Sequence, residues 1–276
     1  MESLAEPQVH YDRITDAWQY LLGQDFHYGY FTGPDESLEA ATRQLSELMA
    51  EKGRIGPHLS VLDVGCGIGT PARLLAGQYG CRVTGISTSA VGIGQATRQA
   101  RESGCADRVS FIVADGMANG FPDACFDRVW VLESSHLMPD KQALFSECAR
   151  VLCPGGVLVL CDIMLRRHLD ASEVRARSRD FLHLHYAFGH AKLELLESYQ
   201  CLIGRAGLDV LEALDISDAA FLTLAHWQQR LEANVEAVRE LIGTEGVEHF
   251  RASCEILPTL WNAGIFGYGL VAAVKH

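Results

Sequence analysis

The chain has 276 residues, of which 48% are hydrophobic, and a formal net charge of −12 at pH 7. This length suffices for one large domain, or a domain with a cap, around a sizeable core. The negative charge argues against a nucleic-acid partner, because binding phosphates requires a basic surface.

Neither targeting nor membrane insertion is indicated by the sequence. It shows no charged and then apolar leader, and no apolar run reaches the roughly 18 residues of a membrane span. Nine cysteines, none in a C-x-x-C pair, favour reduced thiols over a zinc or redox motif. We therefore expect a soluble, cytoplasmic protein with no membrane partner and no metal.

From residue 60 onward, short apolar runs alternate with helical patterns, which predicts βαβ units and a parallel sheet. Residues 1–50 precede them as a helical lead-in. The expected strands are 60–64, 82–86, 109–113, 126–132 and 157–163, and the helices between them are 71–79, 90–103 and 141–151. Pro154-Gly155-Gly156 is expected to turn the chain into the fifth strand.

Two helix-rich insertions, 164–200 and 217–258, flank late strands at 208–215 and 266–274. The second insertion repeats apolar residues at helical spacing, which is typical of a packed cap helix. We expect an α/β, Rossmann-like, doubly wound and mostly parallel seven-stranded sheet with helical caps. Residues 1–276 would form a single domain, with 51–163 as its cofactor-binding core.

Residues 61–72 read Val-Leu-Asp-Val-Gly-Cys-Gly-Ile-Gly-Thr-Pro-Ala, an apolar strand followed by alternating glycines and a helix start. Glycines let a ligand approach the main chain closely, and the helix start offers unpaired N–H groups. This pattern is typical of a nucleotide-like cofactor site. A dinucleotide site has the same glycine spacing, but it normally adds an acid about 20 residues later. Here the next strand ends in Ser87-Thr88-Ser89, without a carboxylate.

The segment Leu62-Asp-Val-Gly-Cys-Gly-Ile-Gly69 resembles motif I of class I S-adenosylmethionine-dependent methyltransferases. The resemblance implies S-adenosyl-L-methionine as the cofactor and S-adenosyl-L-homocysteine as the product. In that family the acid of the first strand, here Asp63, lies near the amino-acid end of the cofactor. The glycine turn packs along the cofactor, and its residues here are Gly65, Cys66, Gly67 and Gly69. A nicotinamide-dependent oxidoreductase is the alternative from another class.

Later strand ends follow the order of the same family. Asp115 comes directly after the third strand, and the resemblance implies that it meets the adenine amino group. An ordinary surface aspartate in a turn is the alternative. Cofactor contacts are likewise implied for Gly116, Met117 and Glu133.

Within this class the chain resembles small-molecule enzymes of the rebeccamycin sugar O-methyltransferase, tocopherol methyltransferase and cyclopropane synthase kinds. In those relatives an aromatic residue of the lead-in closes over the cofactor. Tyr28 is the candidate here, and an ordinary core position is its alternative. The relatives often place a ribose-binding glutamine where Gly92 stands. The candidates for the ribose contact are therefore Gln95 or the hydroxyls of Ser87, Thr88 and Ser89.

His136 follows the fourth strand, where the reactive methyl group is expected. A neutral imidazole can accept a proton from an acceptor hydroxyl while the oxygen attacks that methyl. Asp162, at the end of the fifth strand, matches an acid that the relatives use beside the acceptor, so we expect a His–Asp pair. A structural histidine is the alternative.

We predict a methyltransferase (EC 2.1.1.-) that acts on a hydroxyl of a small natural-product or secondary-metabolite acceptor. C-methylation of an isoprenoid or an electron-rich ring, and N-methylation, are the alternatives. A homo-oligomer is possible.

Basic residues cluster in the first insertion. One hypothesis is a pocket for an anionic acceptor, with or without a divalent ion. The other is a solvated helical face whose charges pair at helical spacing. The cluster comprises Arg166, Arg167, Arg175, Arg177 and Arg179, followed by His183, His185 and His190.

Overall fold

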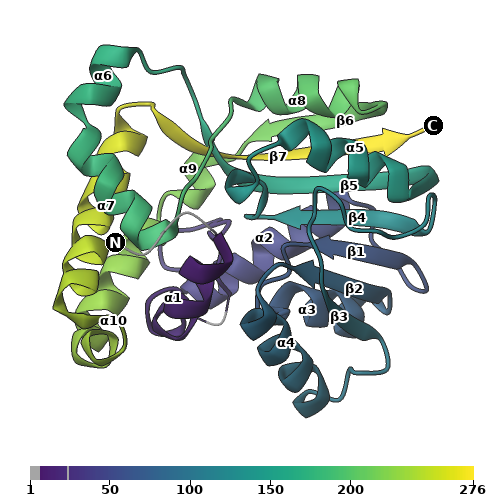
Figure 1. Cartoon of the computed structure of the whole chain (residues 1–276), viewed down its shortest axis with the longest axis horizontal. Coiled ribbons are helices and arrows are strands. Elements are labelled where there is room, and N and C mark those ends of the chain that lie inside the picture. The colour runs from purple at the N-terminus through teal and green to yellow at the C-terminus, as the bar shows by residue number, and fades with distance from the viewer. Residues whose placement is uncertain (1–6, 24) are drawn as a thin grey trace. The chain divides into compact units, whose positions relative to one another are not determined.

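The computed structural model describes residues 7–23 and 25–276 (Figure 1). Its strands form one seven-stranded sheet in the order β3-β2-β1-β4-β5-β7-β6. Pairing is parallel from β3 through β5 and antiparallel between β6 and β7. The strands are β1 (Ser60–Val64), β2 (Arg82–Ser87), β3 (Val109–Val113), β4 (Phe126–Leu132), β5 (Leu152–Leu165), β6 (Leu208–Asp215) and β7 (Phe266–Lys275). The expected Rossmann-like, mostly parallel α/β class is confirmed.

Helices precede, connect and follow these strands. Those of the alternating part are α3 (Thr70–Tyr79), α4 (Ala90–Glu102), α5 (Lys141–Val151), α8 (Leu196–Arg205) and the short 3-10 helix η1 (Ser135–Leu137). The lead-in contains α1 (Pro7–Leu21) and α2 (Leu38–Lys52). The insertions contain α6 (Ala171–Ala176), α7 (Ser178–Phe188), α9 (Ser217–Ala220) and α10 (Thr223–Asn262). None of the helices in the described ranges is long and apolar enough to cross a bilayer.

The beginning of β5 differs from the prediction. Pro154-Gly155-Gly156 does not precede the strand as a turn but lies within it, because the strand already begins at Leu152. Leu152 pairs with Phe126, and Val157 pairs with Arg128, so the register shifts between these two pairs. The extra residues form an irregularity inside the strand, and Gly155 takes a left-handed φ of 76° there.

The chain divides into two compact units. The sheet unit comprises Ser46–Asp162, Leu196–Asp215 and Gly269–His276. The helical unit comprises Met1–Leu45, Ile163–Leu195 and Ile216–Tyr268. That the chain works as a single domain therefore stays a prediction.

The sheet unit has a buried apolar core. Val61, Leu62 and Val64 of β1 are fully buried, as a strand between two parallel neighbours must be when helices cover both faces.

Side chains at the strand ends cap the helices that follow. Ser89 Oγ accepts from Gly92 N at 2.9 Å at the start of α4, and Asp140 Oδ1 accepts from Ala143 N at 2.9 Å at the start of α5. These caps satisfy free N–H groups and fix where each strand-end loop finishes.

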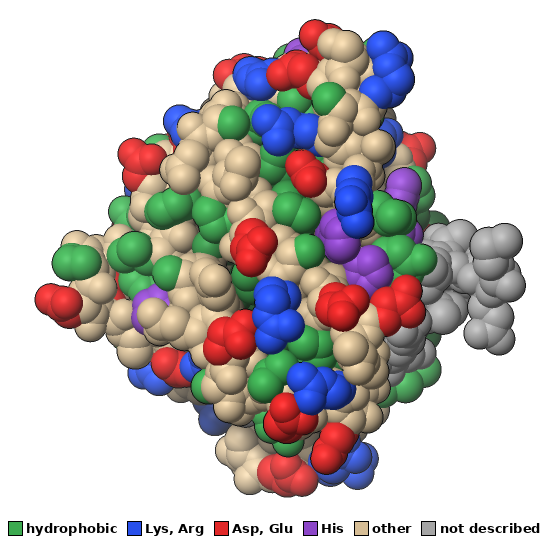
Figure 2. All heavy atoms as spheres, turned by 90° about the vertical axis from the view of Figure 1, so that its left-hand side faces the viewer, with side chains coloured by type: hydrophobic (Ala, Val, Ile, Leu, Met, Phe, Trp, Pro, Cys, Tyr) green, Lys and Arg blue, Asp and Glu red, His purple; other side chains and the backbone are tan. Residues whose placement is uncertain are grey.

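In the helical unit, α10 packs against both α1 and α7. Its 40 residues are interrupted by non-helical conformations at Asn234 and at Gly243, where φ is 74°. On the face of the molecule in Figure 2, acidic and basic side chains are interspersed, and histidine side chains gather at one place. His183 of α7 and His249 of α10 lie in contact, with their Nδ1 atoms 3.0 Å apart.

Candidate functional site

The glycine turn after β1 combines close packing with open space. A Cβ on Gly65 would lie 2.5 Å from Ser134 Oγ, and one on Gly69 would lie 2.5 Å from the Phe111 ring. A Cβ on Gly67, by contrast, would meet no atom within 4 Å. All three glycines have left-handed φ angles. The turn is therefore pressed against the protein at both ends and open in its middle, where a ligand can approach the backbone.

Asp63 is the buried acid at the end of β1, with a side chain only 2% exposed. Its Oδ2 atom is buried and makes no hydrogen bond to any described residue. Burial raises the pKa of this carboxyl to about 7. Burial, and then the charge of Asp63, also raise the pKa of the Cys66 thiol well above its usual range. A cationic ligand group beside Asp63 would supply the partner that Oδ2 lacks.

At the end of β2, serine hydroxyl groups accept hydrogen bonds from backbone N–H groups. Ser87 Oγ accepts from Ser89 N at 3.2 Å, and Ser89 caps α4. Thr88 is exposed, and Gln95 is half-buried on α4. An added Cβ on Gly92 would lie 3.3 Å from Gly67 O. A side chain at position 92 would therefore begin directly beside the glycine turn. Gln95 lies one helical turn further along α4.

At the end of β3, Asp115 forms a turn in which its Oδ1 accepts from Met117 N at 2.9 Å. Gly116 is tightly enclosed, since a Cβ there would lie 2.7 Å from Val64 Cγ1 and 2.9 Å from Met138 Cε. The turn that carries Asp115 is thereby held against the end of β1.

Glu133 follows β4 in a left-handed conformation, with φ of 45°. This angle is uncommon for a residue with a side chain and carries a strain cost. Its backbone N–H donates to Cys161 O at 2.9 Å, which keeps the chain on β5 through the bend. The bend turns the chain from β4 into η1.

His136 and Asp162 are in direct contact at the ends of β4 and β5. The His136 Nδ1 atom lies 2.7 Å from Asp162 Oδ1, and the His136 backbone N–H donates to Asp162 Oδ2 at 3.0 Å. Asp162 is fully buried and His136 is 8% exposed. Burial alone would raise the pKa of Asp162, but the His136 charge and the donated hydrogen bonds together lower it. The carboxylate is therefore ionised, and the pairing expected from the sequence is present as a contact.

Sequence reasoning missed three buried residues around this pair. Ser135 Oγ lies 2.5 Å from Asp162 Oδ2 and 2.9 Å from the Tyr199 hydroxyl. Lys141 Nζ donates to Ser135 O at 3.0 Å and to Met138 O at 3.1 Å. Ser135 adjoins His136 in the sequence, but nothing local marks Tyr199, which comes from α8.

Tyr28 belongs to the helical unit. It is 3% exposed, and its ring centroid lies 4.6 Å from that of Trp227, 5.5 Å from that of Trp261 and 5.0 Å from that of Tyr268. The other predicted cofactor residues all lie in the sheet unit, at the carboxyl ends of β1 to β4, where ligands of open parallel sheets bind. The closing of Tyr28 over a cofactor stays a prediction.

Acids partly neutralise the basic cluster of the first insertion. Arg167 pairs with Glu173 at 2.8 Å, and Arg177 approaches Asp180 to 3.7 Å. These pairs favour the solvated-face interpretation.

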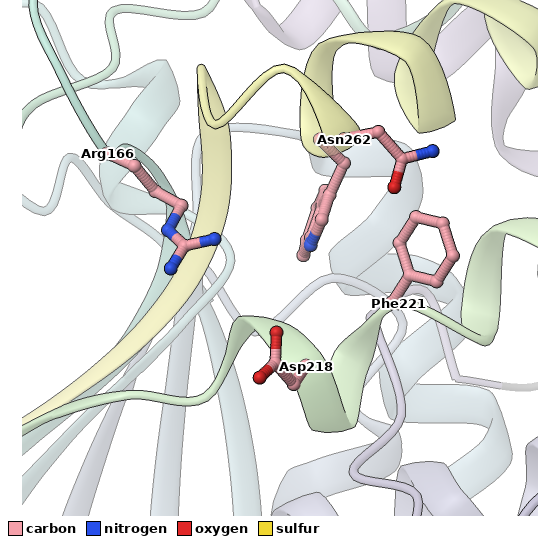
Figure 3. A pocket seen from close by; sticks show the side chains of 5 residues that line it. Arg166, Asp218, Phe221 and Asn262 are labelled. Atoms are coloured by element: carbon pink, nitrogen blue, oxygen red, sulfur yellow. The ribbon is translucent and has the colours of Figure 1, made fainter.

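Arg166 instead lines a pocket of about 400 Å³ in the helical unit. In Figure 3 the Arg166 side chain extends from one segment, and the side chains of Asp218 and Phe221 extend from another, toward the same space. Trp261 and Asn262 complete the lining.

Comparison with known proteins assigns the family. The sequence pattern described as mycolic acid cyclopropane synthetase matches residues 2–256. The chain belongs to this family of class I methyltransferases. It is therefore an S-adenosylmethionine-dependent methyltransferase that acts on small molecules, which decides against a nicotinamide cofactor.

Individual relatives fit this assignment. The methyltransferase GfsG of Streptomyces halstedii is 34% identical over 268 residues, covering 96% of this chain and 92% of that protein. The 27-O-demethylrifamycin SV methyltransferase of Amycolatopsis mediterranei is 34% identical over 248 residues, covering 88% and 85%. A sterol 24-C-methyltransferase of Eremothecium gossypii is 30% identical over 210 residues, covering 76% and 56%.

Among solved structures, the [4+2]-cyclase SpnF superposes with a TM-score of 0.84 at 26% identity. The match covers 97% of this chain and 95% of that one.

The residues at the strand ends fit S-adenosylmethionine. The buried Asp63 Oδ2, which makes no hydrogen bond to a described residue, suits the ammonium group of the cofactor, and the open side of Gly67 leaves room beside the backbone. The Asp115 turn after the third strand carries a carboxylate that accepts one backbone hydrogen bond, and a carboxylate has further lone pairs for an adenine amino group.

Proposed function

We propose that the enzyme transfers the methyl group to a hydroxyl oxygen of a small natural product, with His136 as general base and Asp162 as its partner. The observation that carries this proposal is the 2.7 Å contact between His136 Nδ1 and Asp162 Oδ1. The name of the rifamycin relative, which specifies an O-demethylated acceptor, supports oxygen as the nucleophile.

The hydrogen bonds define the direction of proton transfer. An ionised Asp162 can only accept, so in the neutral imidazole of His136 Nδ1 carries the proton and Nε2 carries the lone pair. S-adenosylmethionine, when bound, supplies an electrophilic methyl group. His136 Nε2 would take the hydroxyl proton as the oxygen–methyl bond forms and the sulfur–methyl bond breaks, which leaves S-adenosylhomocysteine. Asp162 would stabilise the resulting imidazolium.

Positioning contributes more to such a reaction than the base does. A general base accelerates it by about 10²–10⁴-fold. Alignment of the two reacting groups can remove roughly 7–11 kcal/mol from the barrier. The residues proposed for alignment of the cofactor are Asp63 and the glycine turn at its amino-acid end, Gln95, Ser87 and Thr88 at the ribose, and Asp115, Gly116 and Met117 at the adenine. Glu133 and Tyr28 are the further residues proposed to contact the cofactor.

The test incubates the protein with methyl-labelled S-adenosylmethionine and an extract of the source cells, then identifies labelled products by mass spectrometry. We expect one labelled O-methyl ether. His136→Ala should lower turnover about 10²-fold or more with little change in cofactor affinity. The matched control is His276→Ala, because His276 also contacts a carboxylate, Asp209, at 2.6 Å, but on the surface. Equal turnover in wild type and His136→Ala would remove His136 from the mechanism.

Carbon methylation is the second candidate, supported by the sterol 24-C-methyltransferase relative. It predicts a label on carbon, in a product that resists ether cleavage. Binding of S-adenosylhomocysteine without any labelled product would instead suggest a role without methyl transfer, such as the cyclase named in the structural comparison.

A further inference from the structure

A buried chain of hydroxyl groups lies behind the His136–Asp162 pair. It begins at Tyr199 on α8, continues through Ser135 and ends on Asp162 Oδ2. We propose that Ser135 and Tyr199 are positioning residues that fix the orientation and charge of Asp162, and thereby set how readily His136 takes up a proton. The inference rests on the proposed role of His136.

Proton counting gives the direction of each hydrogen bond. The ionised Asp162 has no proton to offer, so the Ser135 hydroxyl donates to it across 2.5 Å. A serine hydroxyl has one hydrogen, so Ser135 can only accept from the Tyr199 hydroxyl across 2.9 Å. The chain therefore runs from Tyr199 to Ser135 to Asp162, and each bond polarises the next.

The geometry also restrains the carboxylate. Oδ1 of Asp162 accepts from His136 Nδ1, while Oδ2 accepts from the His136 backbone and from Ser135. Three donors on two oxygens leave no free rotation of the group. Tyr199 is fully buried, and its ring meets Phe145 of α5 edge-on with centroids 6.0 Å apart. The packing of Tyr199 on α5 thus fixes the position of the chain of hydroxyls. Because Tyr199 is buried, this chain is suited to positioning Asp162 and not to exchanging protons with solvent.

The electrostatic consequence has a definite sign. Each hydroxyl directs the positive end of its dipole toward Asp162, which partly offsets the negative potential that the carboxylate exerts on His136. Removal of either hydroxyl strengthens that potential and stabilises the protonated imidazole. The direct donor, Ser135, should matter more than the indirect donor, Tyr199.

The experiment follows the His136 ring nitrogens by NMR in the full chain without cofactor, as a function of pH, with His136→Ala to assign the signals. Tyr199→Phe should move the titration midpoint of this ring to higher pH by roughly a few tenths of a unit, and Ser135→Ala by about one unit. The acid limb of the pH–rate profile should move in the same direction. Tyr79→Phe, which removes a phenolic hydroxyl at the end of α3, is the matched control and should shift neither.

The outcomes separate the two proposals. If Tyr199→Phe lowered kcat without moving the titration midpoint of the His136 ring, Tyr199 would contribute only through packing, and the inference would be overturned. Full turnover by His136→Ala would instead refute the proposed function, whatever the NMR midpoints. If Ser135→Ala does not fold, as judged by thermal unfolding, Tyr199→Phe alone decides, because it keeps the buried ring.

Discussion

Asp63→Asn should show how much the buried Asp63 carboxylate lowers the free energy of unfolding of the protein without cofactor. The pKa of Asp63 rises from an ordinary 3.8 to about 7 through burial alone. Between these two values the folded chain holds a proton that the unfolded chain has lost, so the free energy of unfolding falls as pH rises. Each pH unit corresponds to about 1.4 kcal/mol, and the shift of about three units therefore costs about 4 kcal/mol at neutral pH and above.

The variant removes this pH-dependent cost. An asparagine side chain would be equally unpaired, with a penalty of about 1–3 kcal/mol that does not change with pH. The quantity to measure is therefore the difference in unfolding free energy between variant and wild type. From pH 5 to pH 8 it should rise in favour of the variant by about 3 kcal/mol.

Urea unfolding of both proteins without cofactor, followed by circular dichroism and tryptophan fluorescence, measures this difference. Effects of titrating groups that do not interact with Asp63 cancel in the subtraction. Isothermal calorimetry with S-adenosylhomocysteine should show weaker binding by Asp63→Asn, because the ammonium group loses its charged partner. Parallel stability curves from pH 5 to pH 8 would refute the argument that Asp63 is ionised at a cost.

Two further predictions concern the buried Lys141 and the half-buried His249. Lys141→Met removes the donor that holds Ser135 O and Met138 O, and it should lower the free energy of unfolding by about 1.5–3 kcal/mol in urea titrations. Burial, and then the charge of His183, lower the pKa of His249 below 6.5. The folded chain therefore binds fewer protons than the unfolded chain below about pH 6.5, and stability falls on acidification. His249→Gln should flatten the decrease in Tm between pH 7 and pH 5, and an unchanged slope would contradict this.

The sheet could be predicted from the sequence because its signals are local. Strands appear in the sequence as short apolar runs, and β1, β3 and β4 have the expected bounds. The start of β5 could not be predicted, because Pro154-Gly155-Gly156 has the local character of a turn. Pairing with β4 overrides that character and carries the strand through it.

The candidate site was predictable where topology alone brings residues together. Parallel strands end at one edge, so residues that follow β1 to β5 must gather there, and His136 and Asp162 do meet. Tyr199 was not predictable in this way, because it reaches Ser135 from a helix 64 residues further along the chain. Such a contact depends on helix packing, for which a single sequence carries no positional signal.

Gly65 joins the two halves of this site. Ser134 Oγ donates to Val64 O at 2.6 Å, and the missing Cβ of Gly65 lets Ser134 come this close. Ser134 immediately precedes η1, which carries His136. Gly65→Ala should therefore weaken S-adenosylhomocysteine binding and also disturb the His136–Asp162 contact.

Gly67→Ala is the matched variant, because its φ is also left-handed but its Cβ would point into open space. It should weaken binding of S-adenosylhomocysteine in calorimetry while the His136 ring titrates as in wild type. If Gly65→Ala likewise left the ring signals of the cofactor-free protein unchanged, the end of β1 would not position the base, and the two halves of the site would be independent.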